Sequence, residues 1–207
     1  APGSRPRRRR ISATTTGIFI TLAGGGDIPQ TVVAGNLQLL LLTCNSIENV
    51  RGGAGNDFIF GNSLDNRLEG NGGDDFLYGD MGNDTYAFTA DTALGNDTIL
   101  ENADSEGGVD TLDFSGTLLN GITINLSNPS LQIVNANLSL TLINNLYPPI
   151  PLPYAFENVV GGAQADNING NDLDNILIGG AGSDTISAGD GDDTLDGGTG
   201  DDYLFGD

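Results

Sequence analysis

The sequence lacks histidine and tryptophan, and it contains a single cysteine, Cys44, among its 207 residues. The absence of histidine excludes catalysis by imidazole and zinc sites of the histidine–cysteine type. One cysteine cannot form an internal disulfide, and with no base to activate it we expect Cys44 to be a buried apolar side chain rather than a nucleophile. Apolar runs are short as well. The longest, 37–42, is far below the ~20 residues that span a bilayer, so we expect no membrane span.

Basic residues are few and unevenly placed. The chain has 7 arginine and lysine residues against 28 aspartate and glutamate residues, a formal net charge of −21. Five of the seven are Arg5, Arg7, Arg8, Arg9 and Arg10, so the balance beyond residue 10 is 2 − 28 = −26. Such a surface repels phosphate backbones and attracts cations, which argues against nucleic acid as a partner of the main body. We interpret residues 1–15 as a basic tail or linker.

A long internal repeat indicates a tandem duplication. Segments 17–23, 32–42 and 48–57 align, in the same order, with 121–127, 133–143 and 157–166. We therefore expect a first module over 16–118 and a second over 119–207, the second with a proline-rich irregular loop at 144–156. In both modules apolar residues alternate at every second position, as at Ile18 and Ile20 or Leu138 and Leu140. This alternation predicts β-strands, and no segment shows a sustained helical period, so we expect an all-β chain.

A shorter repeat of nine residues recurs without gaps, four times over 52–87 and five times over 161–205. Small residues occupy positions one to five, Asp or Asn is at position six, and an apolar residue is at position eight. The stretch 95–114 keeps the Asp-Thr-aliphatic core of the repeat with longer spacers, so we expect degenerate coils there. A further copy begins at 206–207, within a β-roll block that we place at 161–207, and we expect the chain to be part of a longer protein.

The nine-residue period predicts a solenoid. Position eight lies at the centre of a three-residue strand, so its side chain points inward while those at positions seven and nine point outward. Two repeats form one coil with a strand on each side, and each strand pairs only with strands of the neighbouring coils. We therefore expect parallel β-roll (β-solenoid) blocks that alternate with short β-strand segments, in two tandem modules.

The composition of the turns between these strands indicates that they bind a cation. They bury little apolar surface, and carboxylates that recur at position six form ladders of like charge on each side of the roll. Asp side chains and the carbonyls of glycine turns are hard oxygen ligands, which suit calcium better than magnesium, and softer metals have no ligand set here. The alternative, a solvated acidic face with ordinary Asp-Gly turns, does not explain a period without gaps.

The repeat G-G-x-G-x-D-x-U-x resembles the repeats-in-toxin (RTX) family, the haemolysin-type calcium-binding nonapeptides. The resemblance implies a parallel β-roll with several calcium ions, each between one repeat and the next but one. It implies side-chain ligands at position six, namely Asp57, Asp75, Asp84, Asp166, Asp184, Asp193 and Asp202. It also implies carbonyl ligands in the turns, with Gly53, Gly55, Gly73, Gly82, Gly180, Gly182, Gly191, Gly198 and Gly200 as candidates.

Three repeats depart from the family pattern. Repeats 61–69 and 170–178 have leucine where a glycine is expected and Asn66 or Asn175 at position six, and repeat 161–169 has Gln164 at the glycine position. We expect poor calcium occupancy at these turns. We expect the strongest sites where 179–184 stacks on 197–202.

Other features leave two interpretations open. The outward side chains Phe58, Phe60, Phe76 and Tyr78 either bind a partner or, as we favour, are covered by the strands of residues 17–42.

Carboxylates at Glu101, Asp104 and Glu106 could serve a glycosidase, but a cluster in one polar loop needs no catalytic explanation. Threonines along the repeats could bind ice or carbohydrate, yet they fall on different faces. The sequence has neither H-E-x-x-H nor G-x-S-x-G, so we expect no enzyme activity.

These observations lead to a functional prediction. Calcium binding by the nonapeptide repeats drives folding of a structural or adhesive β-roll segment of a larger protein, and the alternative is a non-catalytic accessory region of a secreted toxin or hydrolase. The resemblance further implies an extracellular location, reached through type I-like export of a bacterial protein as an unfolded chain.

Overall fold

The computed structural model of the protein describes residues 18–21, 37–40, 49–102, 108–144 and 155–206. The basic tail 1–15, Cys44, Asp104, Glu106 and nearly all of the proline-rich loop 144–156 lie outside these residues, and so does Asp207. The described residues form β-strands and turns without a helix, which confirms the all-β prediction. They accordingly contain no helix able to cross a bilayer.

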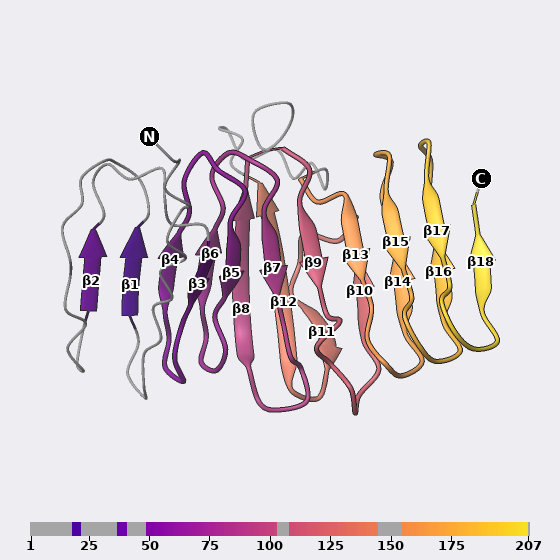
Figure 1. Ribbon diagram of the computed structural model, residues 1–207, viewed down its shortest axis with the longest axis horizontal. Helices are drawn as coiled ribbons and strands as arrows, with labels where there is room; N and C mark the ends of the chain where they lie inside the picture. Colours follow the sequence, from indigo (N-terminus) through magenta and orange to yellow (C-terminus); the bar gives the residue numbers. More distant parts are fainter. Residues whose placement is uncertain (1–17, 22–36, 41–48, 103–107, 145–154, 207) are drawn as a thin grey trace, which may run out of the picture.

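The strands form three sheets (Figure 1). The first sheet has the order β11 (Gln132–Asn135), β12 (Leu138–Asn144), β8 (Gly95–Glu101), β6 (Phe76–Tyr78), β4 (Phe58–Phe60), β1 (Ile18–Thr21) and β2 (Leu37–Leu40). The second has the order β17 (Thr194–Asp196), β15 (Ile176–Ile178), β13 (Asn158–Val160), β9 (Thr111–Asp113), β7 (Thr85–Ala87), β5 (Arg67–Glu69) and β3 (Asn49–Arg51). The third has the order β10 (Thr123–Asn125), β14 (Asn167–Asn169), β16 (Thr185–Ser187) and β18 (Tyr203–Phe205).

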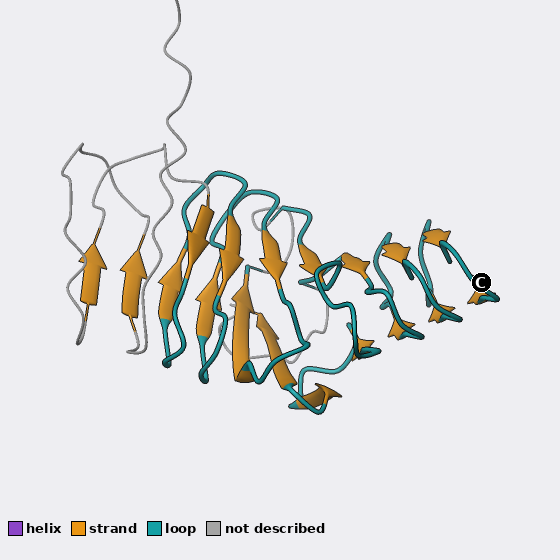
Figure 2. Ribbon diagram, turned by 60° about the horizontal axis from the view of Figure 1, so that its bottom comes forward, coloured by secondary structure: helices purple, strands orange, loops and turns teal. Residues whose placement is uncertain are grey.

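The pairing register shows a parallel β-roll. Phe58 of β4 pairs with Phe76 of β6, and Ile176 of β15 pairs with Thr194 of β17, so neighbouring strands are two nonapeptides apart. One coil therefore contains two repeats, as the nine-residue period predicts. Figure 2 shows the result at the C-terminal end, where two rows of strands face each other and turns connect them. All pairs are parallel except β11 with β12.

The core is a double row of position-eight side chains. Ile59, Leu68, Leu77 and Tyr86 in the first block have no exposed surface, and Ile168, Leu177 and Ile186 continue the row in the second. Leu204 is 45% exposed, because no described coil covers the last strand. One inward side chain per nine residues is a thin core, so the stability of the roll depends strongly on its turns.

The two nonapeptide blocks share one roll. Strand β9 of the first block pairs with β13, which precedes the second block, with Thr111 opposite Asn158. Strand β12 pairs along its whole length with β8, so that Leu138 lies opposite Gly95. The division into modules 16–118 and 119–207 stays a prediction, and the sheets run across that boundary.

Strands β1 and β2, the described part of residues 17–42, lie beside the aromatic side chains in the same sheet rather than over them, so the expectation is wrong for these two strands, and the rest of 17–42 lies outside the described residues. Strand β1 pairs with β4 in the same sheet, with Phe19 opposite Phe58, and β2 extends the sheet further. Strand β1 pairs with the free backbone edge of β4. This pairing satisfies more backbone hydrogen-bonding groups than packing of the strands across the face of the sheet would. The rings instead stack along the sheet, with 6.0 Å between the centroids of Phe58 and Phe76.

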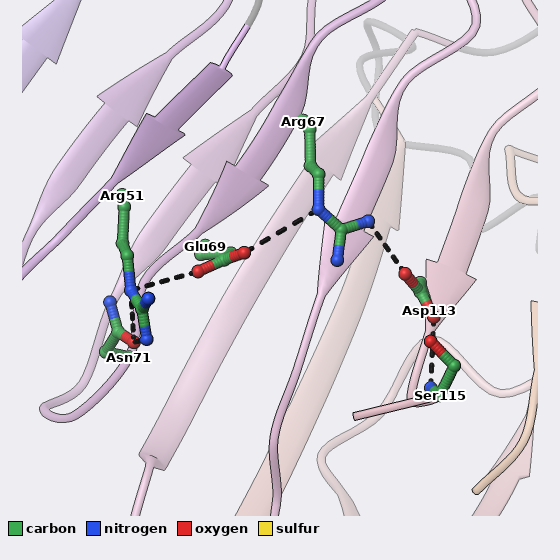
Figure 3. A network of polar contacts seen from close by, with 6 residues as sticks. All are labelled: Arg51, Arg67, Glu69, Asn71, Asp113 and Ser115. Carbon is green, nitrogen blue, oxygen red and sulfur yellow. Dashed lines mark hydrogen bonds and ion pairs between the residues drawn. The ribbon is translucent and has the colours of Figure 1, made fainter. Parts of the chain in front are cut away.

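The outer face of the second sheet carries a chain of ion pairs (Figure 3). Arg51 Nε lies 3.0 Å from Glu69 Oε2, and Arg67 contacts both Glu69 and, at 2.7 Å, Asp113 Oδ2. Partly exposed pairs of this kind contribute about 0.5 kcal/mol each. These ion pairs engage both described arginines, and Arg51 also donates to Asn71 Oδ1 of the turn 70–75, at 3.0 to 3.1 Å.

Candidate metal centre

The position-six residues form two ladders along the roll. The turns that precede the first and third sheets contribute one set, Asp57, Asp75, Asp97, Asp166, Asp184 and Asp202. The turns that precede the second sheet contribute the other, Asn66, Asp84, Asp110, Glu157, Asn175 and Asp193. Both ladders arise because each three-residue strand begins directly after position six.

In most of the aspartate rungs, one carboxylate oxygen accepts a backbone hydrogen bond from the neighbouring coil. The Asp57 N–H donates to Asp75 Oδ1 at 2.7 Å, and the Asp75 N–H donates to Asp97 Oδ1 at 2.9 Å. The same bond recurs in the second block, from the Asp166 N–H to Asp184 Oδ1 at 2.8 Å and from the Asp184 N–H to Asp202 Oδ1 at 2.9 Å. These bonds fix the direction in which each carboxylate points.

The second oxygen of four carboxylates has no hydrogen-bond partner in the described part of the chain. These buried atoms are Oδ2 of Asp75, Asp84, Asp97 and Asp184. The four side chains are at most 3% exposed. An anionic oxygen held away from water without a partner is strongly unfavourable, so each of these atoms indicates a missing positive ligand.

Other turns satisfy the second acceptor themselves. The Gly53 N–H donates to Asp57 Oδ2 at 2.7 Å, and the Gly162 N–H donates to Asp166 Oδ2 at 2.6 Å. In the two repeats with asparagine at position six, the side-chain oxygen accepts from the N–H at position two, at 2.8 Å for Asn66 and 2.9 Å for Asn175. We call 52–57, 61–66, 161–166 and 170–175 the capped turns.

Backbone conformation separates the capped turns from the others, which we call the open turns: 70–75, 79–84, 179–184, 188–193 and 197–202. Every open turn has positive φ at positions two and four, including the non-glycine residues Asn71 (69°) and Asp80 (80°). The capped turns have no positive φ. A left-handed residue at position two turns its N–H away from position six, and this leaves the carboxylate oxygen without its cap.

The stacked turns are close together where the repeat has glycine. Gly182 has φ of 130°, and a Cβ there would lie 2.5 Å from the carbonyl carbon of Gln164. At position one, a Cβ on Gly79 would overlap Asp84 Oδ2, and one on Gly179 would overlap Asp184 Oδ2. Seven of the predicted carbonyl donors have positive φ, namely Gly73, Gly82, Gly180, Gly182, Gly191, Gly198 and Gly200, whereas Gly53 and Gly55 lie in a capped turn.

Burial makes the charged form of these carboxylates unfavourable. It raises the pKa of Asp75 and of Asp84 from 3.8 to about 7, and that of Asp97 to about 8, against the lowering effect of the backbone hydrogen bonds. Burial likewise raises the pKa of Asp184. A cation beside these groups reverses the effect, because opposite charge favours ionisation.

Three carboxylates gather most closely at the first block. Ligand oxygens of Asp84, Glu101 and Asp110 all lie within 4.8 Å of one another, and the three side chains are buried. Asp97 and Asp110 were missed as ligands by the sequence interpretation, although each precedes a threonine and an aliphatic residue as in a regular repeat. Glu101 occupies a position where the repeat has glycine, so no repeat signal could have found it.

The donor set fits calcium. The unpartnered atoms are carboxylate oxygens, the turns add backbone carbonyls, and the open turns are glycine-rich enough to adapt their geometry. Calcium accepts six to eight such oxygens, whereas magnesium demands a tighter octahedron. The residues therefore offer what a hard divalent cation needs.

Comparison with known families agrees with this chemistry. A family model described as RTX calcium-binding nonapeptide repeat (4 copies) matches residues 46–63, 51–86 and 169–204. These ranges contain the first block and, from its second repeat onward, the second block, each except its last residue. A comparison with curated proteins gave no match.

Proposed function

We propose that this chain is a calcium-binding repeat protein and that calcium drives its folding, because it carries matches to the RTX calcium-binding nonapeptide repeat that fold as a parallel β-roll. The observation that carries this proposal is the set of four buried, unpartnered oxygens at Asp75, Asp84, Asp97 and Asp184. Each becomes favourable only when a cation replaces the water that folding removes.

We assign the side-chain ligands by turn type. Among the predicted ligands, Asp75, Asp84 and Asp184 are supported by an unpartnered oxygen, and Asp193 and Asp202 by their place in open turns. Asp166 already accepts backbone hydrogen bonds on both oxygens, and Asp57 uses Oδ2 to cap its own turn, so we rank these two below the others as ligands. The carbonyls of the predicted glycines complete the coordination.

Calcium then acts by mass action. An ion that binds the folded roll and not the unfolded chain stabilises the roll by RT ln(1 + [Ca]/Kd) at each site. If the sites resemble other extracellular modules, with Kd of about 10⁻⁴ to 10⁻³ M, they are empty inside a cell and filled outside it. This supports a role as a secreted structural or adhesive segment that is exported unfolded and folds after export.

Calcium titration followed by circular dichroism tests the proposal. The protein is stripped with a chelator, and calcium is then added back. We expect the β-sheet signal to be weak in chelator and to grow with calcium, whereas magnesium at the same concentration restores far less. A β-sheet signal that is complete in chelator and insensitive to millimolar calcium would falsify the proposal.

A further inference from the structure

Glu101 places a third carboxylate in a turn where the repeat provides two at most. Strand β8 pairs with β6 so that Leu100 lies opposite Tyr78, and Glu101 therefore follows at the level of Gly79. Gly79 is the position-one glycine of its repeat. A Cβ built on Gly79 would overlap both Asp84 Oδ2 and Glu101 Oε1, so these two oxygens meet above the same glycine.

Tyr86 holds Glu101 in this place. It is the only aromatic residue at a position-eight site of the nine repeats, and it is fully buried. Its hydroxyl accepts a hydrogen bond from the Gly79 N–H at 2.7 Å and donates to Glu101 Oε1. The ring of Phe156 packs edge-on against Tyr86 with 6.1 Å between centroids, which fixes the ring from the other side.

Asp110 completes the group from the next coil. Its Oδ1 accepts a hydrogen bond from the Asp84 N–H at 2.8 Å, and its own N–H donates to Glu157 Oε2 at 2.7 Å. Glu157 directly precedes β13, the strand that continues the second sheet toward the second block. The group therefore lies where the two blocks join.

An acidic group alone does not indicate a ligand, but here Asp84 Oδ2 is a buried atom without a hydrogen-bond partner and points into the group. Both described arginines are engaged on the outer face of the second sheet, so no cationic side chain in the described protein compensates the three carboxylates.

We propose that Asp84, Glu101 and Asp110 form a three-carboxylate calcium site, positioned by Tyr86, that binds more tightly than the regular repeat sites. Affinity of calcium sites rises with the number of charged ligands and with rigidity, and this site has an extra carboxylate on a fixed hydrogen-bond network. The site fills first and joins the two blocks. The assignment rests on the proposed function in taking calcium as the ion.

Calcium calorimetry on the full chain tests the site. In the unaltered protein, we expect the first equivalent of calcium to bind more tightly than the rest. Glu101→Gln keeps the size of the side chain and removes its charge, and we expect this variant to lose affinity for the first equivalent on the order of tenfold or more. The control is Glu69→Gln, the same change at the end of β5, where the carboxylate pairs with arginines. Equal binding curves for the two variants would overturn the proposal.

Terbium luminescence locates the same site. Tyrosine transfers excitation to a bound terbium ion only over short distances, and the protein has no tryptophan. We expect the first equivalent of terbium to emit on tyrosine excitation, and Tyr86→Phe to lose most of that emission. Tyr78→Phe serves as the control, because the Tyr78 hydroxyl contacts Asp80 and Asn102 instead.

Two further results decide the remaining cases. If Tyr86→Phe emits as strongly as the unaltered protein, the ion is not beside Tyr86 and the proposal fails. If Glu101→Gln or Tyr86→Phe lacks the β-sheet signal at saturating calcium, Glu101→Asp is measured in its place. Glu101→Asp keeps the charge on a shorter side chain, and we expect its calcium affinity to lie between that of the unaltered protein and that of Glu101→Gln. If the unaltered protein folds fully in chelator, the proposed function is wrong, but the calcium affinities of the variants can still be compared with one another.

Discussion

Each position-six carboxylate has two oxygens with different tasks. Oδ1 of Asp184 accepts the Asp166 N–H and aligns the coil, whereas Oδ2 has no partner among the described residues. Asparagine at the same position, as in Asn66 and Asn175, uses its side-chain oxygen to cap its own turn. Charge at position six therefore serves the cation, and hydrogen bonding serves the fold.

Asp184→Asn separates these tasks. The variant retains an oxygen for the Asp166 N–H but loses the charge beside the calcium position. We expect calcium affinity in the second block to fall about tenfold or more while the roll still forms at high calcium. Isothermal titration calorimetry measures this, with Asp201→Asn as the control, since Asp201 is exposed on the neighbouring turn. Identical titrations of the two variants would contradict the ligand role of Asp184.

Gly182→Ala tests the close stacking of turns. Gly182 has φ of 130°, and a methyl group there would meet the backbone of Gln164 and Ala165 at 2.5 to 2.7 Å. Both strain and overlap destabilise the open turn, so we expect a loss of about 2 kcal/mol in the free energy of unfolding at saturating calcium. Urea denaturation measures it. Ala181→Gly, at the preceding position, is expected to change stability far less, and equal losses would refute the stacking argument.

At the scale of the element, the turns are of two kinds. Capped turns close their own hydrogen bonds, as when the Leu64 N–H donates to Asn62 Oδ1 and the Asn62 N–H donates to Asn66 Oδ1. Leu173, Asn171 and Asn175 repeat the arrangement in the second block. Such a turn needs no cation. Every open turn, by contrast, has a left-handed position two, and in three of them Asp75, Asp84 or Asp184 has a buried oxygen without a partner among the described residues.

Hydrogen exchange distinguishes the two kinds of turn. On partial removal of calcium, we expect the amides of Asp75 and Asp184, which lie in open turns and donate to the carboxylates of Asp97 and Asp202, to lose protection first. The amides of Asn62 and Asn171, held within capped turns, lose it later. Simultaneous loss at all four amides would show that turn type has no bearing on local stability.

Much of this could be predicted from the sequence, because the nine-residue period fixes which side chain points inward. Ile59 and Leu177 are buried as that period requires, and the β-roll follows. Leu64, Gln164 and Leu173 mark departures from the repeat, and the turns that contain them, 61–66, 161–166 and 170–175, are capped, while their poor calcium occupancy stays a prediction. Glu101 could not be predicted as a ligand, because it reaches the carboxylates only through the pairing of β8 with β6, which lies outside the period. Turn 52–57 has the regular sequence, so its capping depends on backbone conformation and not on composition.

At the scale of the whole molecule, negative charge dominates. The 28 acidic residues face 7 basic ones, and the two described arginines lie on the outer face of the second sheet (Figure 3). Two ladders of acidic side chains, the second interrupted by Asn66 and Asn175, run along a roll in which each repeat strand contributes one side chain to the core. Cations in the turns therefore reduce repulsion and hold neighbouring coils together at once.

Low pH should stabilise the metal-free roll and so partly substitute for calcium. In the metal-free roll the pKa values of Asp75 and Asp84 are raised to about 7 and that of Asp97 to about 8, so folding favours the protonated groups. The stability that this adds is present below the unfolded pKa near 3.8 and is lost as pH rises through 7 to 8. Circular dichroism in chelator should thus show more β-sheet at about pH 5 than at about pH 9. The opposite trend, or none, argues against buried carboxylates as the cause of instability.

A crystal structure of the protein grown in calcium tests the central claim most directly. We predict calcium ions at about 2.3 to 2.6 Å from Oδ2 of Asp75, Asp84, Asp97 and Asp184, with carbonyl oxygens of the stacked turns completing each shell. Anomalous scattering identifies the ions. Turns that hold only water beside these four oxygens, in crystals with abundant calcium, would contradict the account.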